Sequence, residues 1–153
     1  MIRDAAFIRP YADADFEDVW NMNAGMQGAS YEGAVFVRQA AFLYPQSFFV
    51  LQGPQGVSGF TIAALVQGHH PPEGWILRLH VAEEYRRSGY GRMLLRASIR
   101  SLAVSGAGKV LLSVAPDNVA ALDLYTSEGF VLVSRAERYF GPGKDRLIME
   151  KSV

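Results

Sequence analysis

Between residues 75 and 134, short apolar segments alternate with helical segments, and turns that contain glycine or proline separate them. Residues 75–81, 109–114 and 130–134 have the length and composition of strands. Residues 92–105 carry leucine and isoleucine at helical spacing. A strand that is followed by a helix and another strand forms a crossover, which pairs its strands in parallel. This part of the chain therefore predicts a sheet covered by helices.

A hairpin precedes this alternation. The apolar segments 47–51 and 57–66 flank the turn Gly53–Gly56, which is the pattern of two antiparallel strands. The other predicted elements are a strand over 6–10, helices ending near residues 23 and 43, a helix that starts at 116–118 and is ended by Gly129, and a strand over 147–151. Hairpins together with crossovers predict an α/β or α+β domain of three layers around a mixed sheet.

Composition removes several classes of function. The 153 residues suit one domain, which we expect to span residues 1–153. The 15 basic and 15 acidic side chains cancel, so a general nucleic-acid or membrane-surface binder is not expected. The absence of cysteine excludes disulfides, thiolate metal sites and a cysteine nucleophile. The apolar run Gly59–Val66 is too short to span a bilayer and the N-terminus has no signal-peptide pattern, so a cytoplasmic protein is expected.

The turn after the strand at 75–81 has the composition of an anion site. Gly89 and Gly91 lie among Arg86, Arg87 and Arg92, and an apolar helix follows at once. The first N–H groups of a helix have no internal partner, and glycine lets an anion approach the backbone closely. The turn therefore suits a phosphate or pyrophosphate. The alternative interpretation is a glycine-assisted helix start with a solvated basic face.

A second motif follows in the next predicted helix, where Asn118 and Tyr125 are seven residues apart and share one face. Taken alone, Tyr125 would be a packing residue. The two motifs, in chain order, are Arg86-x-x-Gly89-x-Gly91 and Asn118-x-x-Ala121-x-x-Leu124-Tyr125-x-x-x-Gly129-Phe130. Both together, at this separation, resemble the GNAT superfamily of N-acetyltransferases over nearly the whole chain. That resemblance implies a central, mostly antiparallel sheet of about six or seven strands flanked by about four helices.

The resemblance also implies an activity, the transfer of an acetyl group from acetyl-CoA to a primary amine. Asn118 would contact the pantetheine arm or anchor its loop, and Tyr125 would protonate the leaving thiolate. The backbone that would bind pantetheine is that of Leu79, His80 and Val81. The residues that would hold the pyrophosphate are Arg86, Arg87, Ser88, Gly89, Tyr90, Gly91 and Arg92. Since the chain has no cysteine and no G-x-S-x-G, direct transfer is favoured over an acyl-enzyme.

The general base departs from the family pattern. Several members use a glutamate fourteen residues before the first motif glycine, and here that position is Trp75. Glu73 would share a strand face with Trp75 and is the candidate base, acting directly or through water. Alternation along the strand puts His80 on the face opposite Trp75, where it is expected to pack against a helix. No metal is expected.

The acceptor is suggested by the tail, where Tyr139-Phe140-Gly-Pro-Gly143-Lys-Asp145-Arg146 is similar to the branch that acetylates protein N-termini, including those of ribosomal proteins. Tyr139 would help to hold the peptide backbone, and Trp75 would also contact the acceptor. Phe140 and Arg146 depart from the pattern. The alternatives are a small amine, such as a polyamine, amino acid or antibiotic, and a non-catalytic acyl-CoA-binding module. A homodimer is compatible with either.

Overall fold

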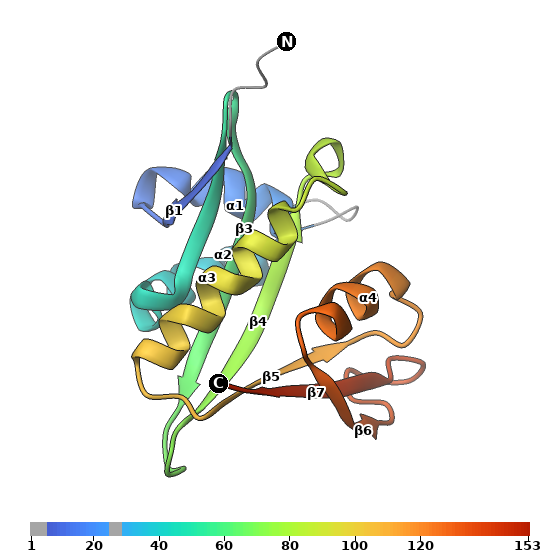
Figure 1. Cartoon of the computed structure of the whole chain (residues 1–153). Coiled ribbons are helices and arrows are strands. Elements are labelled where there is room, and N and C mark those ends of the chain that lie inside the picture. Colours follow the sequence, from blue (N-terminus) through green and yellow to red (C-terminus); the bar gives the residue numbers. More distant parts are fainter. Residues whose placement is uncertain (1–5, 25–28) are drawn as a thin grey trace.

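A computed structural model describes residues 6–24 and 29–153 of the chain (Figure 1). The described residues form one sheet of seven strands in the order β1-β2-β3-β4-β5-β7-β6. The strands are β1 (Phe7–Pro10), β2 (Phe48–Gly53), β3 (Gly56–Val66), β4 (Glu73–Val81), β5 (Lys109–Val114), β6 (Val131–Ala136) and β7 (Arg146–Ser152). The α-helices of this part are α1 (Phe16–Asn23), α2 (Tyr31–Leu43), α3 (Tyr90–Val104) and α4 (Val119–Ser127).

The sheet is mixed and mostly antiparallel, as expected. The predicted hairpin is β2–β3, and among the described strands only β4 and β5 pair in parallel. Helix α2 ends at the predicted residue, Leu43, and begins at Tyr31, because the Ser30 side chain caps it by accepting a hydrogen bond from the Gly33 amide at 3.0 Å.

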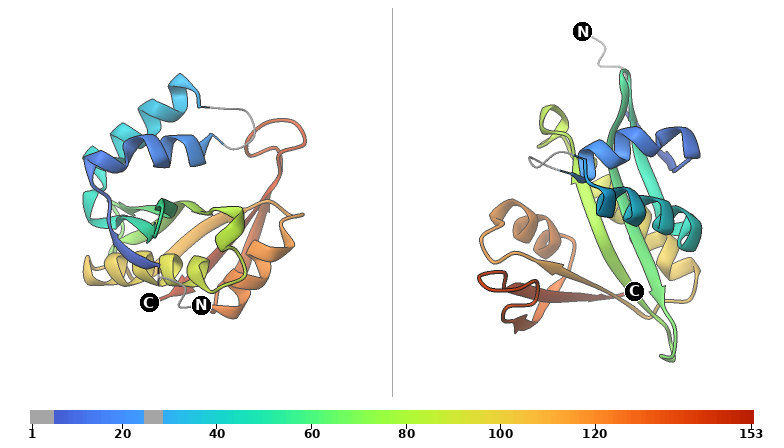
Figure 2. Two further views of the ribbon diagram at one scale, coloured as in Figure 1. Left: turned by 90° about the horizontal axis from the view of Figure 1, so that it is seen from above. Right: turned by 180° about the vertical axis from the view of Figure 1, so that it is seen from behind.

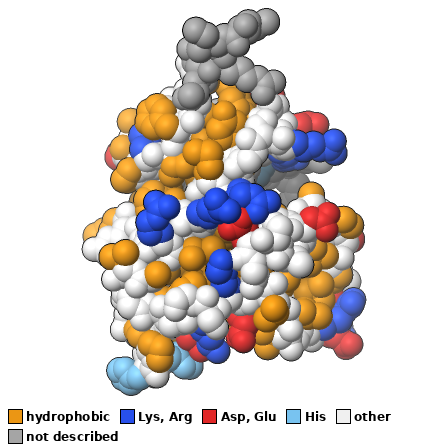
Figure 3. Space-filling view, viewed as in Figure 1, with side chains coloured by type: hydrophobic (Ala, Val, Ile, Leu, Met, Phe, Trp, Pro, Cys, Tyr) orange, Lys and Arg blue, Asp and Glu red, His pale blue; other side chains and the backbone are white. Residues whose placement is uncertain are grey.

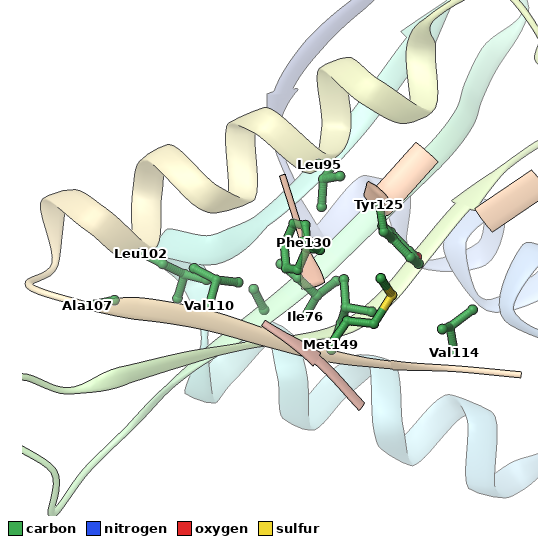
Figure 4. Packing of buried hydrophobic residues seen from close by; sticks show 11 residues of the cluster. Ile76, Leu95, Leu102, Ala107, Val110, Val114, Tyr125, Phe130 and Met149 are labelled. Atoms are coloured by element: carbon green, nitrogen blue, oxygen red, sulfur yellow. The ribbon is translucent and has the colours of Figure 1, made fainter. Parts of the chain in front are cut away.

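Helices cover both faces of the sheet, which gives the three predicted layers (Figure 2). Helices α1 and α2 lie on one face, where Val19 and Val37 pack against Phe48 and Phe60 of the sheet. Helices α3 and α4 lie on the other face, and Tyr125 of α4 joins their cluster (Figure 4). The sheet residues and partners of that second cluster include Ala63, Ile76, Leu95, Leu102, Val110, Leu112, Phe130 and Met149. Successive side chains of a strand point alternately toward these two clusters. This alternation decides which side chains can reach a site on either face of the sheet.

A bulge in β4 reverses this alternation. Ile62 of β3 pairs with Arg78 but its neighbour Ala63 pairs with Ile76, so Leu77 has no partner across the ladder. A bulge bends its strand and re-aims the side chains that follow it. Ile76 and Leu79 consequently both pack on the α3 side, although they are three residues apart.

The prediction that His80 lies opposite Trp75 is wrong for this reason. The His80 ring lies 6.1 Å from the Phe60 ring, in the layer of α1 and α2. Trp75 lies between Gly74, whose Cβ would meet Leu102 of α3, and the α3-facing Ile76, so it points to the layer of α1 and α2 as well. Partial burial, and to a lesser extent the charge of Arg86, lower the pKa of His80.

The parallel pairing of β4 with β5 is short. It joins Glu73–Ile76 to Lys109–Leu112 and then stops. Beyond this point β4 follows β3, whereas β5 follows β7 toward the other side of the molecule (Figure 1). The sheet therefore opens between β4 and β5, and the α3–α4 layer lies over this opening.

Helices α3 and α4 are tied together by a buried carboxylate. Glu128 follows α4 and its side chain is only 6% exposed, yet it accepts hydrogen bonds from Arg92 and Arg96 of α3. Arg96 contributes two of these, each of 3.0 Å. Figure 3 shows basic side chains gathered beside an acidic one in the middle of this face, between the two helices. The hydrogen bonds from Arg96, with those from Arg92, lower the pKa of Glu128.

Replacing this carboxylate should loosen the two helices. We expect Glu128→Gln to lower the free energy of unfolding at pH 7 by about 2 kcal/mol, because hydrogen bonds to charged groups contribute about 1.5–3 kcal/mol. For a chain of this size the thermal midpoint should fall by about 4–8 °C. Since the pKa of Glu128 is lowered by folding, this stabilisation is complete at neutral pH and is lost as the pH falls below about 4.3 and through the folded value.

Thermal unfolding across pH checks this expectation. Glu137→Gln is the matched control, because Glu137 is exposed and forms no ion pair within residues 6–24 and 29–153. Equal midpoints for Glu128→Gln and wild type at pH 7 would contradict the role given to Glu128.

Candidate active site

The opening between β4 and β5 holds a small pocket of about 130 Å³. Strand β4 contributes its bulged segment, β5 its last residues, α4 its inner face and β7 its first residue. The lining residues are Ile76, Leu77, Arg78, Leu79, Leu112, Ser113, Val114, Asn118, Ala121, Tyr125 and Arg146. No carboxylate or imidazole is among them.

Tyr125 lines both this pocket and a larger one, as do Leu79, Asn118 and Ala121. The tyrosine is 8% exposed and its ring lies 5.9 Å from that of Phe130. Asn118 begins α4 by accepting a hydrogen bond from the Ala121 amide at 3.2 Å, which fixes the helix that carries Tyr125. Burial raises the pKa of Tyr125, against a smaller opposing effect of Arg146, so the phenol is protonated at neutral pH. The motif thus brings Asn118 and Tyr125 together as the sequence predicted.

The larger pocket, of about 520 Å³, runs from Tyr125 to the glycine-rich turn. Its lining residues are Leu79, Val81, Arg86, Arg87, Gly89, Gly91, Arg92, Asn118, Ala120, Ala121, Leu124 and Tyr125. Beyond Ile76 the edge of β4 that faces this opening pairs with no described strand. The Val81 carbonyl accepts a hydrogen bond from Arg86 Nε, and the other peptide groups on this edge are available to an elongated ligand. The resemblance implied such a role for Leu79, His80 and Val81.

The turn itself presents its backbone. Gly89 has φ +84°, Arg87 has φ +60°, and α3 begins at Tyr90. The amide groups of residues 87–92 donate no hydrogen bond to an acceptor in the described parts of the chain. A Cβ on Gly89 would meet nothing within 4 Å, so the space beside these amides is open. Successive free N–H groups at a helix start fit a phosphate or pyrophosphate.

The arginines of the turn differ in what they offer. Arg87 is exposed at the pocket, and Arg86 donates from Nε to the Val81 carbonyl at 2.9 Å. Arg92 was expected to add a free charge, but its guanidinium is bound to Glu128. The groups of the turn that remain to contact an anion are therefore its amides, Arg86 and Arg87.

Glu73 does not lie at this site. It begins β4, six residues before Leu79, which is about 20 Å along an extended strand. Its carboxylate lies 3.3 Å from Lys109 Nζ and 3.8 Å from His69 Nδ1, in a separate pocket at the far end of the strand. The geometry argues against Glu73 as the general base, because it cannot reach a proton beside Tyr125.

The two residues expected to contact the acceptor line neither of these pockets. Trp75 lines neither pocket, and Tyr139 is 52% exposed in the turn between β6 and β7. Sequence reasoning missed Arg78 and Arg146, which do line the small pocket. Arg146 was noticed only as a departure from the tail motif, and the bulge that turns Arg78 toward the opening has no sequence signature.

The described residues contain neither a metal-binding cluster nor a membrane-spanning helix. Within 6–24 and 29–153, no three His, Cys, Asp or Glu side chains come together as a set that could hold a metal ion. In the same ranges, no helix has the length and apolar character to cross a bilayer.

The chain is similar to known acetyltransferases in sequence and in structure. Residues 10–130 match the Acetyltransferase (GNAT) family. An N-alpha-acetyltransferase of Sulfurisphaera tokodaii is 30% identical over 69% of this chain and 69% of its own length. N-alpha-acetyltransferase 30 of Schizosaccharomyces pombe is 27% identical over 90% of this chain and 92% of its own length. The crystal structure of Ard1 from Thermoplasma volcanium is 26% identical and superposes with a TM-score of 0.85, covering 97% of this chain and 98% of that one.

The family match, the two relatives and the common fold agree with the motifs at the turn and on α4. The chain therefore belongs to the GNAT family of acetyltransferases, as an acetyl-CoA-dependent N-acetyltransferase.

Proposed function

We propose that the chain acetylates the α-amine of a peptide or protein N-terminus by direct transfer from acetyl-CoA. The observation that carries the proposal is the small pocket beside Tyr125, whose described lining contains a protonated phenol and two arginines but no group that could take a proton from an amine. The relatives named N-alpha-acetyltransferase support the same acceptor.

Acetyl-CoA binds as a substrate along the larger pocket. The amides of residues 87–92, with Arg86 and Arg87, hold its pyrophosphate. The free edge of β4 at Leu79–Val81 binds the pantetheine arm and orients the thioester toward Tyr125. The Asn118 side chain is occupied as a helix cap, so it keeps α4 in place and lines the path of pantetheine.

The transfer itself needs a neutral amine and a protonated leaving group. The amine nitrogen attacks the thioester carbon, the carbon–sulfur bond breaks, and the Tyr125 hydroxyl gives its proton to the departing sulfur. The proton that the amine loses goes to water, from which the phenolate regains its own. Because burial raises the pKa of Tyr125, the phenol holds its proton until the thiolate forms.

The lack of a base in the pocket selects the acceptor by its own pKa. An α-amine has a pKa of about 7.7–8.0 and a lysine amine one of about 10.4. At pH 8 about half of the α-amines but below about 1% of lysine amines are neutral. Arg78 and Arg146 also repel a protonated amine, and a polyamine even more strongly. These properties favour an α-amine over a lysine side chain or a polyamine.

The turn can be tested by substitution at Gly89. We expect Gly89→Val to weaken the binding of acetyl-CoA at least tenfold, because a β-branched residue at φ +84° forces the turn to rearrange. Gly106→Val is the matched control, since Gly106 has φ +101°, open space around its Cβ and a position outside the pocket. Both variants should lose stability, but only Gly89→Val should lose affinity in calorimetry. Wild-type affinity in Gly89→Val would remove the turn as the pyrophosphate site.

The role of Tyr125 can be tested by removing only its hydroxyl. We expect Tyr125→Phe to lower kcat more than tenfold with little change in the Kd for acetyl-CoA, because the ring still packs against Phe130. Tyr44→Phe, at the end of α2 in the opposite layer, should behave as wild type. Thiol release with a short peptide acceptor measures kcat. An unchanged kcat in Tyr125→Phe would mean that another donor protonates the sulfur.

The amine preference can be tested with two peptides of one sequence. One has a free α-amine and no lysine; the other has a blocked α-amine and a single lysine. At pH 8 we expect acetylation of the first at least fiftyfold faster, given the neutral fractions of the two amines. Mass spectrometry locates the added acetyl group. Comparable rates would show that an unrecognised group deprotonates the acceptor.

A further inference from the structure

Two guanidiniums face the acceptor side of the opening. Arg146, in β7, donates from Nε to Ser113 Oγ at 3.1 Å and from Nη2 to the Ser113 carbonyl at 2.9 Å. Arg78, in β4, lies with its guanidinium carbon 5.7 Å from the centre of the Phe36 ring of α2. Arg146 is thus held in place from β5, while Arg78 reaches in from the opposite wall.

Neither guanidinium has a carboxylate partner within residues 6–24 and 29–153. The ion-paired arginines are Arg9 with Asp15, Arg38 with Asp13, Arg92 and Arg96 with Glu128, and Arg135 with Asp145. Of the six described arginines without such a partner, Arg86 and Arg87 lie at the glycine-bearing turn, and Arg100 and Arg138 are exposed and line neither pocket. The other two lie at the opening, where Arg78 is exposed and Arg146 is half-buried.

Acidic side chains near the opening do not neutralise this pair. Glu32 lines a pocket of about 410 Å³ together with Arg78 but forms no ion pair with it. Asp117 and Asp145 line a pocket with Arg146. Asp117 forms no ion pair with it in the described residues, and Asp145 is bound by the Arg138 amide and the Arg135 guanidinium. Burial, and after it the charge of Arg78, lower the pKa of Arg146, so each guanidinium lies in the field of the other.

We propose that Arg78 and Arg146 bind a carboxylate that the acceptor carries close to its α-amine, so that the chain prefers acidic N-termini. This inference rests on the proposed function. A carboxylate offsets the repulsion between two guanidiniums and can accept paired hydrogen bonds from either fork. Because Arg78 lines both the small pocket and the pocket beside α2, a peptide that leaves Tyr125 in that direction passes it within its first residues. The acidic side chain is therefore placed at position 2 or 3.

The test compares peptides that differ at one position. Each has a free α-amine and a C-terminal amide, with Asp, Asn or Lys at position 2 or at position 3. We expect kcat/KM for the Asp peptide to exceed that for the Asn peptide at least tenfold, which corresponds to about 1.4 kcal/mol. The Lys peptide should be the poorest acceptor. A dipeptide with a free C-terminal carboxylate and no acidic side chain tests whether a chain end can supply the carboxylate instead.

Variants of Arg78 assign the preference to the site. Arg78→Gln should reduce the ratio between Asp and Asn peptides to below threefold, and Arg78→Glu should favour the Lys peptide. Arg100→Gln is the matched control, because Arg100 is an exposed arginine of α3 without an ion pair in the described residues, and it should keep the wild-type ratio.

The outcomes separate this inference from the function on which it rests. Equal kcat/KM for Asp, Asn and Lys peptides would overturn the acidic preference while leaving an N-terminal acetyltransferase. If the preference for Asp peptides survives both Arg78→Gln and Arg78→Glu, these arginines are not its source. If no peptide is acetylated although acetyl-CoA binds in calorimetry, the proposed acceptor class fails, and the acidic preference fails with it.

Discussion

The pairing between β4 and β5 ends at Ile76 and Leu112, and both pockets of the site lie beyond that point. If the ladder continued, the edge of β4 would be hydrogen-bonded and no peptide group would be available to an extended ligand. The bulge at Leu77 bends β4 at the same place and re-aims its side chains. Tyr125 of α4 packs over the gap between β4 and β5. One interrupted pair of strands therefore opens the space for both pockets, which share Tyr125 as a lining residue.

Charge is distributed so that the site stays positive in a chain with no net charge. Glu128 neutralises Arg92 and Arg96 where α3 meets α4, so these arginines hold the helices together. In the proposed function the turn binds an anion through its amides instead. Near the pockets, the arginines without a carboxylate partner among the described residues are those at the turn and at the opening. This arrangement reserves positive charge for ligands on both sides of Tyr125.

The sequence predicted the order of elements, the glycine-bearing turn before α3 and the helix that carries Asn118 and Tyr125, because these depend on local spacing. It failed where distant strands decide the geometry. Simple alternation misplaced His80, since the bulge in β4 is set by its register against β3. Glu73 lies in β4, as part of the site does, but at the opposite end of that strand. Arg92 was misjudged because its partner, Glu128, lies 36 residues away in the chain.

In the proposed function, an acceptor pocket whose described lining has two arginines and no base imposes opposite demands on its ligand. The positive field disfavours a protonated amine, which helps catalysis because only the neutral amine attacks, but it also weakens the binding of most amines in solution. A carboxylate on the same acceptor resolves this conflict, because it supplies attraction at Arg78 and Arg146 while the amine enters neutral. The acidic group then contributes binding energy at a distance from the reacting nitrogen, and the low pKa of an α-amine provides the neutral form that no described side chain of the pocket generates.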